Sequence, residues 1–209
     1  MRERNLAIFL TAAILAACSD SSPNFTTRGL IAPNAQCMID PRRAGEAERI
    51  DDIGERNGCM VENAWRMNAV AGVGFSRPAI VNCGVVGPLS NWMTNTVQPA
   101  AQNAFGESVV AVDVAASYSC RPRNNRDGAK MSEHGYGNAI DIAAFTLESG
   151  RKVTVEQGFW GARSESRFLQ KVRDDACGEF NTVLGPGSDS HHKDHLHLDL
   201  ANRRSKHCR

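Results

Sequence analysis

The chain has 209 residues, a length that fits one domain with a sizeable core, because domains commonly run to between about 100 and 200 residues. Its 24 Lys and Arg residues against 23 Asp and Glu residues give a net charge of +1. No basic stripe interleaved with aromatic residues appears, so we expect no nucleic acid partner and look for the function at a specific site.

The first residues are typical of an export signal. Residues 1–4 are charged, and the apolar run at residues 6–17 is shorter than the about 20 residues that a membrane-spanning helix needs. The run ends in LAAC, which resembles the lipobox of bacterial lipoproteins and implies cleavage after residue 17 and lipidation of Cys18. An ordinary secretory signal is the alternative. Either interpretation predicts export, and the first predicts a lipid-anchored protein at the periplasmic face of the cell envelope.

The segment after the signal is predicted to be a flexible tether. Residues 18–36 are mostly polar and turn-forming and show no periodicity, as expected of a linker between a lipid anchor and a folded body. We therefore place the folded domain at residues 37–209.

The cysteines of this body predict disulfide bonds. Six remain when Cys18 is set aside, an even number that indicates three disulfides in an exported protein. No C-x-x-C spacing occurs, which argues against a cysteine zinc site or a redox motif. Fifteen pairings are possible, and a bond from the penultimate residue would hold down the end of the chain. The six are Cys37, Cys59, Cys83, Cys120, Cys177 and Cys208.

The body mixes predicted helices and strands. Residues 88–104 carry apolar side chains at helical spacing, and Pro99 is expected to kink or interrupt this helix. Residues 108–120 are rich in β-branched and small residues and predict a strand, which residues 121–128 follow as a turn. A second helix is predicted at residues 165–177. We therefore expect an α+β fold, in which helices flank a small antiparallel sheet and disulfides staple the structure.

Four of the six histidines lie in one stretch of ten residues, HHKDHLHLDL at 191–200. From residue 196 to residue 200, leucines alternate with polar residues, so the stretch predicts a strand with one buried face. His195, His197 and Asp199 then point to the opposite side from the leucines. Because same-face residues two apart lie about 7 Å apart, both imidazoles can reach one site.

A second polar group lies at residues 132–141, SEHGYGNAID. In a helix, His134 and Asp141 would be about 10 Å apart, but Gly135 and Gly137 favour a loop that can fold the two side chains together. Asp141 lies within NAIDIAAF, which again predicts a strand with a polar residue presented on one face.

Two imidazoles and one carboxylate are a typical ligand set of catalytic zinc, which keeps a fourth position for water. We expect His134, Asp141 and His197 to bind Zn²⁺ on the sheet, and His195 to act as a base or electrophile beside it. His195 as an outer-sphere residue or a ligand is the alternative. Ordinary loop hydrogen bonds would explain His134 and Asp141 if they stood alone.

The pattern S-x-H-x-x-G-x-A-x-D followed by H-x-H resembles the LAS metallopeptidases, which include lysostaphin-type enzymes, D-Ala-D-Ala peptidases and the hedgehog signalling domain. More narrowly, SYSCRPRNN, SEHGYGNAIDI and HHKDHLHLDLA resemble bacterial extensin-like C-terminal domain proteins over most of residues 37–204. His192 matches the H-x-x-H-x-H spacing of the murein endopeptidase branch, and Arg121 resembles an arginine of the D-Ala-D-Ala peptidases. We assign His192, Arg121 and Ser132 to substrate contact or to support of the ligands, with a surface position as the alternative for His192.

The resemblance implies a zinc-dependent peptidase that cleaves stem peptides or cross-links of peptidoglycan, as an endopeptidase or a carboxypeptidase. The alternative is a non-catalytic, zinc-containing module that binds cell wall or protein, because one fold can serve either role. A catalytic site needs a base beside the metal and a structural site does not, so His195 favours the enzyme.

Overall fold

The computed structural model describes residues 36–55 and 57–209. The predicted signal peptide, the predicted lipidation residue Cys18 and all of the predicted tether except residue 36 lie outside these ranges. Within the described ranges, no helix is long and apolar enough to cross a membrane.

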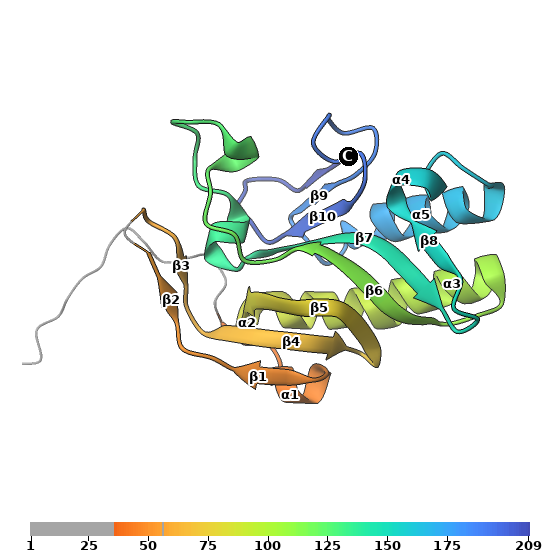
Figure 1. Ribbon diagram of the computed structural model, residues 1–209, viewed down its shortest axis with the longest axis horizontal. Coiled ribbons are helices and arrows are strands. Elements are labelled where there is room, and N and C mark those ends of the chain that lie inside the picture. Colours follow the sequence, from red (N-terminus) through yellow and green to blue (C-terminus); the bar gives the residue numbers. More distant parts are fainter. Residues whose placement is uncertain (1–35, 56) are drawn as a thin grey trace, which may run out of the picture. The chain divides into compact units, whose positions relative to one another are not determined.

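Nine strands of the described chain form one mixed sheet (Figure 1). Their order is β1-β4-β5-β6-β7-β10-β9-β11, and β8 pairs with β7. Neighbours are antiparallel except for β5 with β6 and β9 with β11, which are parallel. β2 (Ile53–Gly54) and β3 (Met60–Val61) form a separate hairpin. The strands of the sheet are β1 (Ala47–Arg49), β4 (Ala64–Val70), β5 (Val73–Asn82), β6 (Val109–Ala116), β7 (Ala139–Leu147), β8 (Lys152–Thr154), β9 (Thr182–Leu184), β10 (Leu196–Asp199) and β11 (His207–Cys208).

The longer helices lie behind the sheet in the view of Figure 1. A helical run passes without a break through α2, a π-helical segment and α3, and α5 packs beside it. The helical segments are α1 (Pro41–Ala44), α2 (Cys83–Trp92), η1 (Met93–Val97), α3 (Gln98–Phe105), η2 (Arg123–Asn125), η3 (Glu133–Tyr136), α4 (Val155–Gly158) and α5 (Arg163–Ala176).

Trp92 of α2 joins these helices to the sheet. Its side chain is fully buried, and its indole N–H donates to the carbonyl of Val172 in α5 at 2.9 Å. Its ring packs against Phe145 of β7, with 6.2 Å between the ring centroids, and against Phe180 at 6.5 Å. Aromatic contacts of this kind stabilise a core beyond the area they bury. The core is therefore built directly under β7, the strand that carries Asp141.

The prediction of mixed helices and strands is confirmed, but the expected small, antiparallel sheet is wrong in size and partly in strand direction. The difference lies in residues 47–82, which contribute β1, β4 and β5 and for which the sequence pattern predicts no strand. In β5 the alternation of buried and exposed residues breaks around Pro78, where three successive residues are exposed. Such a strand lacks the period of two by which strands are identified.

The predicted element bounds also differ. The helix expected from residue 88 begins at Cys83, because the sequence CGVVG at 83–87 has low helix propensity but lies buried in the core, where packing decides. Pro99 lies near the start of α3, directly after the π-helical segment, so the expected interruption takes the form of a change in helical hydrogen bonding within a run that does not break. β6 ends at Ala116, so residues 117–120 belong to a loop instead of the predicted strand.

The predicted three disulfides are confirmed in the described part of the chain, and the structure resolves their pairing. The bonds join Cys37 to Cys83, Cys59 to Cys120 and Cys177 to Cys208, across 46, 61 and 31 residues of sequence. The last of them holds the end of the chain against the C-terminal end of α5, as expected.

Candidate metal centre

Two neighbouring strands bring Asp141 and His197 together. In the antiparallel pairing of β7 with β10, His197 lies directly opposite Asp141, and opposed residues present their side chains on the same face of a sheet. Leu196 and Leu198 belong to the hydrophobic core, as the alternation in the sequence predicts. His197 Nδ1 and Asp141 Oδ1 are 2.8 Å apart.

The loop before β7 supplies His134. The loop makes one 3₁₀ turn, η3, and leaves it at Gly137, whose φ of 58° is left-handed. A Cβ atom at Gly137 would lie 2.6 Å from Val61 Cγ1 and 2.9 Å from the backbone nitrogen of Asn82, so only glycine fits there. The Asn82 N–H donates to the Gly137 carbonyl at 2.7 Å and holds the turn against β5. The turn brings His134 Nε2 within 3.2 Å of Asp141 Oδ2.

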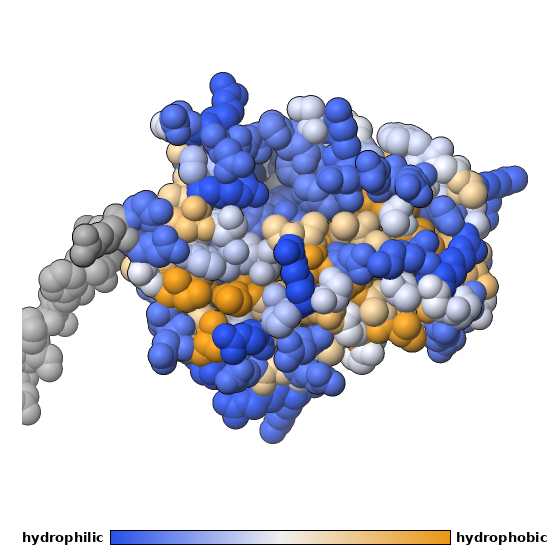
Figure 2. Space-filling model, in the orientation of Figure 1, coloured by the Kyte–Doolittle hydropathy of each residue, from blue (hydrophilic) through white to orange (hydrophobic). Residues whose placement is uncertain are grey.

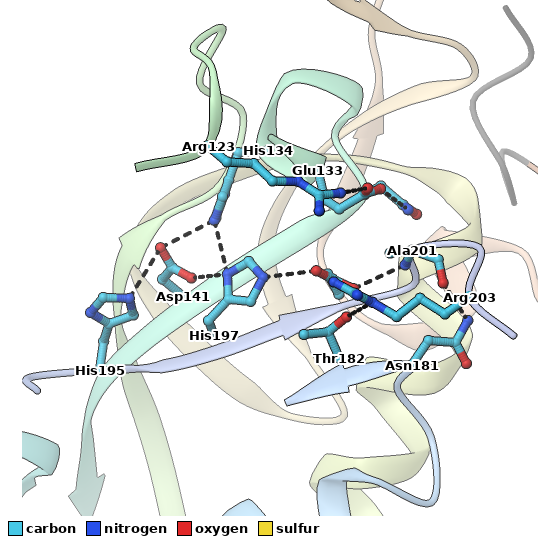
Figure 3. Close-up of polar contacts among 12 residues, drawn as sticks. Arg123, Glu133, His134, Asp141, Asn181, Thr182, His195, His197, Ala201 and Arg203 are labelled. Carbon is cyan, nitrogen blue, oxygen red and sulfur yellow. Dashed lines mark hydrogen bonds and ion pairs between the residues drawn. The ribbon is translucent and has the colours of Figure 1, made fainter. Parts of the chain in front are cut away.

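The three side chains meet at one point (Figure 3). His134 Nε2 lies 3.2 Å from His197 Nδ1, which completes a triangle with the carboxylate of Asp141. One potential ligand atom from each residue lies within 4.8 Å of the others, and all three residues are buried. No other group of three or more His, Cys, Asp or Glu side chains in the described ranges meets this criterion.

The outward-facing nitrogens of both histidines are occupied. His134 Nδ1 donates to the carbonyl oxygen of Ser117 at 2.6 Å, and His197 Nε2 donates to Asp199 Oδ2 at 2.9 Å. A carbonyl and a carboxylate can only accept, so these contacts fix the hydrogens on the outer nitrogens. His134 Nε2 and His197 Nδ1 are then the atoms that face Asp141. Outer hydrogen bonds of this kind orient histidines that bind metals.

Without a metal ion, protons hold this cluster together. Burial disfavours ionised Asp141, but its polar contacts with His134 and His197 outweigh burial and hold the pKa of Asp141 well below its ordinary value. Burial would lower the pKa of His197, yet its hydrogen bonds to Asp141 and Asp199 raise that pKa to about 9. The same contact with His197 keeps the pKa of Asp199 low despite burial. Asp141, His197 and Asp199 are thus charged groups of alternating sign that stabilise one another in a buried site.

The spacing suits a small metal ion in place of those protons. Ligand atoms at about 2.0–2.1 Å from an ion in tetrahedral geometry lie about 3.3 Å from one another. The two imidazole nitrogens are 3.2 Å apart, and each lies near one oxygen of the Asp141 carboxylate: His134 Nε2 is 3.2 Å from Oδ2 and His197 Nδ1 is 2.8 Å from Oδ1. Two imidazoles and a carboxylate are donors that first-row transition metals prefer. His134, Asp141 and His197 therefore form a candidate metal-binding group.

His195 stands beside this group without belonging to it. Its Nε2 is 3.6 Å from Asp141 Oδ2, while its Nδ1 donates to Asp194 Oδ1 at 2.8 Å. The ring of His192 lies 5.2 Å from that of His195 and 5.6 Å from that of His197. His192 Nδ1 donates to Asp189 Oδ1 at 2.7 Å. Burial lowers the pKa of His192, and the neighbouring histidines lower it further, which together outweigh the opposite effect of Asp189. The two rings therefore extend the site from the buried ligands toward solvent.

One cavity of about 470 Å³ is lined by the three candidate ligands and by His192 and His195. It opens between the loop of residues 121–134 and the C-terminal segment, where Figure 2 shows a hollow with a hydrophilic rim. Every residue that the sequence analysis assigned to the site of the folded domain lines it. They are Arg121, Ser132, His134, Asp141, His192, His195 and His197.

Several acidic residues of the site were missed from the sequence. Asp199, Asp194 and Asp189 each accept from one of the site histidines, and Glu133 accepts from Arg123 and Asn138. A signal existed for Asp199, which shares its strand face with His197. The positions of Asp189 and Glu133 depend on loop conformation, which has no period in sequence.

The fold and the site define a disulfide-linked domain of mixed helices and strands with a buried group able to bind a metal ion. Comparison with protein-family models matches residues 35–209 to the family described as extensin-like protein C-terminus, so the chain belongs to that family. The predicted membership of this family is confirmed. Comparisons with curated proteins and with solved structures found no match.

Proposed function

We propose that the protein is a zinc-dependent peptidase that cleaves stem peptides or cross-links of peptidoglycan. The observation that carries the proposal is a buried group of two imidazoles and one carboxylate with a further histidine, His195, 3.6 Å from its carboxylate, inside a cavity open to solvent. Catalytic zinc sites have three protein ligands and one open position. The resemblance of the two motifs to LAS metallopeptidases supports the same assignment.

The residues have distinct roles in this proposal. His134, Asp141 and His197 would hold the ion, which when bound acidifies water and polarises a carbonyl. His195 acts as the base. Because Asp194 fixes the hydrogen on Nδ1, the lone pair of His195 Nε2 faces the site, ready to take a proton and later to return it to the leaving amine. Once protonated, His195 also stabilises negative charge that develops on the carbonyl oxygen.

The test combines digestion with metal analysis. We expect the zinc-loaded protein to release peptide fragments from purified, cross-linked peptidoglycan, and mass spectrometry of the products to identify the bond and the mode of cleavage. His195→Ala should keep its zinc, measured by atomic emission, and lose about 10² to 10⁴ in turnover. His134→Ala, Asp141→Ala and His197→Ala should lose both zinc and turnover.

Three outcomes would contradict the proposal or its parts. Zinc-free His195→Ala would make His195 a ligand. Zinc-loaded His195→Ala with full turnover would remove its catalytic role. Wild-type protein that binds zinc and peptidoglycan but cuts nothing would establish the binding module in place of the peptidase.

We also propose that the mature protein is exported and anchored through acyl chains on Cys18. The LAAC sequence at residues 15–18 supports this, and three disulfides suit an oxidising compartment. Mass spectrometry of the N-terminal peptide should find acylated Cys18, and Cys18→Ser should lack the added mass. An N-terminal peptide with unmodified Cys18 would contradict the proposal.

A further inference from the structure

The C-terminal segment forms one wall of the cavity and is anchored at many points. β11 pairs with β9, with His207 opposite Thr182, and the disulfide from Cys208 ties the segment to Cys177. The Lys206 ammonium group donates to two carbonyls at the end of α5, at 2.6 and 2.7 Å. Two side chains of this segment, Arg203 and His207, line the cavity. Such anchoring holds these side chains in fixed positions beside the candidate metal centre.

Arg203 is oriented by a hydrogen bond to Thr182, which lies beside the hydrogen-bond partner of the candidate ligand His197. His197 Nε2 donates to Asp199 Oδ2, and Arg203 Nε donates to Thr182 Oγ1 at 2.7 Å (Figure 3). Thr182 lies opposite Asp199 in the pairing of β9 with β10. The side chain of Arg203 therefore reaches back over β9 toward the centre.

The terminal nitrogens of Arg203 remain available. A guanidinium has five N–H donors, and among the described residues only the one on Nε has a protein partner. The carboxylates of the cavity that could pair with the Arg203 guanidinium already have other hydrogen-bond partners. Each carboxylate lining the cavity accepts hydrogen bonds from other groups: Glu133 from Arg123 and Asn138, Asp141 from His197, Asp189 from His191 and His192, and Asp199 from His197 and the Ala201 N–H.

We infer that Arg203 binds a carboxylate of the peptide substrate and so determines which peptides are cleaved. The inference rests on the proposed peptidase function and adds a specificity residue to it. His197 and Asp199 are two positions apart on β10, about 7 Å, so the guanidinium beside Thr182 lies within reach of a substrate residue next to the scissile bond. Guanidinium and carboxylate form paired, charge-assisted hydrogen bonds. The carboxylate is either the C-terminus of the peptide or a pendant group on an internal residue.

The experiment measures kcat/KM on three matched peptides: one with both carboxylates, one with the C-terminus amidated and one with the pendant carboxylate amidated. Arg203→Gln should lower kcat/KM by about tenfold to a hundredfold on every peptide that keeps the recognised carboxylate, and leave it unchanged on the peptide that lacks it. The unaffected peptide identifies the source of the carboxylate. Arg204→Gln is the matched control, because Arg204 is exposed and does not line the cavity.

Equal losses on all three peptides, or no loss, would overturn the inference. A binding measurement separates this failure from failure of the proposed function. In the His195→Ala background, which keeps the proposed zinc ligands, calorimetric titration with the free-acid peptide should show affinity about tenfold to a hundredfold weaker for Arg203→Gln than for Arg204→Gln. If wild type cleaves nothing but this difference in affinity holds, the carboxylate site stands and the peptidase does not. Equal affinity of the two variants would overturn the carboxylate site.

Discussion

Asp199 orients His197 by accepting the hydrogen on its Nε2, and the Ala201 N–H in turn holds Asp199 at 2.9 Å. We predict that Asp199→Asn lowers zinc affinity about tenfold to a hundredfold, since a neutral amide is a weaker acceptor and no longer raises the basicity of the ligand. Affinity is measured by competition with a chelator. Asp194→Asn is the control: Asp194 contacts His195 and no ligand, so zinc affinity should stay constant while turnover falls. Unchanged affinity in Asp199→Asn would contradict the orienting role.

In the proposed zinc site, zinc would compete with protons for His197. In the metal-free protein the pKa of His197 is about 9, because hydrogen bonds to Asp141 and Asp199 more than offset the effect of burial. Below that pH the ring is protonated, and a metal ion must displace the proton from Nδ1. We therefore predict that zinc affinity rises about tenfold per pH unit up to about pH 9 and levels off above it. Chelator competition across this range tests the prediction, and affinity that does not change with pH would contradict it.

At the scale of elements, the sequence predicts the two strands at the site but not how they pair. Alternation at residues 196–200 and around Asp141 predicts which side chains share a face, because that pattern is local. The register that sets His197 opposite Asp141 depends on β7 and β10 meeting across more than fifty residues of sequence, and no local pattern encodes it. The sequence does predict that His134 lies near Asp141, because Gly135 and Gly137 exclude a regular helix between them.

The turn at Gly137 has no room for a side chain. Gly137→Ala should destabilise the fold by about 1–3 kcal/mol more than Gly128→Ala, because a side chain at residue 137 meets Val61 and Asn82. Gly128 is the matched control: its φ of +75° is also left-handed, but nothing lies within 4 Å of the position of its Cβ atom. Denaturant unfolding measures both variants. Equal loss of stability would show that φ alone, and not the close packing, requires glycine at residue 137.

For the whole molecule, composition and cysteine count predict an exported, disulfide-linked domain, whereas the extent of the sheet comes from long-range pairing. β1, β4 and β5 are three of the nine strands, and no sequence pattern identified them. β9 and β11 place the C-terminal segment beside the centre. β4 and β5 pack against α2, and β9 packs against α5. Burial is a property of the assembled core, so short windows of sequence do not show it.

The Cys177–Cys208 bond contributes to the stability of the whole fold and also holds the C-terminal segment that lines the cavity. It closes a loop of 31 residues of sequence. By the chain-entropy model, removal of a disulfide that closes such a loop lowers the free energy of unfolding by about 3–4 kcal/mol. We therefore predict that the double variant Cys177→Ser, Cys208→Ser unfolds at a temperature lower by about 6–16 °C. The zinc content of the folded variant should not change, because the ligands lie on β7, β10 and the loop before β7.

Selectivity should respond differently from zinc content. The variant frees the segment that carries Arg203, so the preference for peptides with the recognised carboxylate should shrink toward that of Arg203→Gln. Differential scanning calorimetry, atomic emission and the three matched peptides measure the three effects on one sample. The Cys37→Ser, Cys83→Ser variant is the control, because that bond ties α2 and not the C-terminal segment. Loss of zinc from folded Cys177→Ser, Cys208→Ser would show that the segment supports the metal ligands themselves.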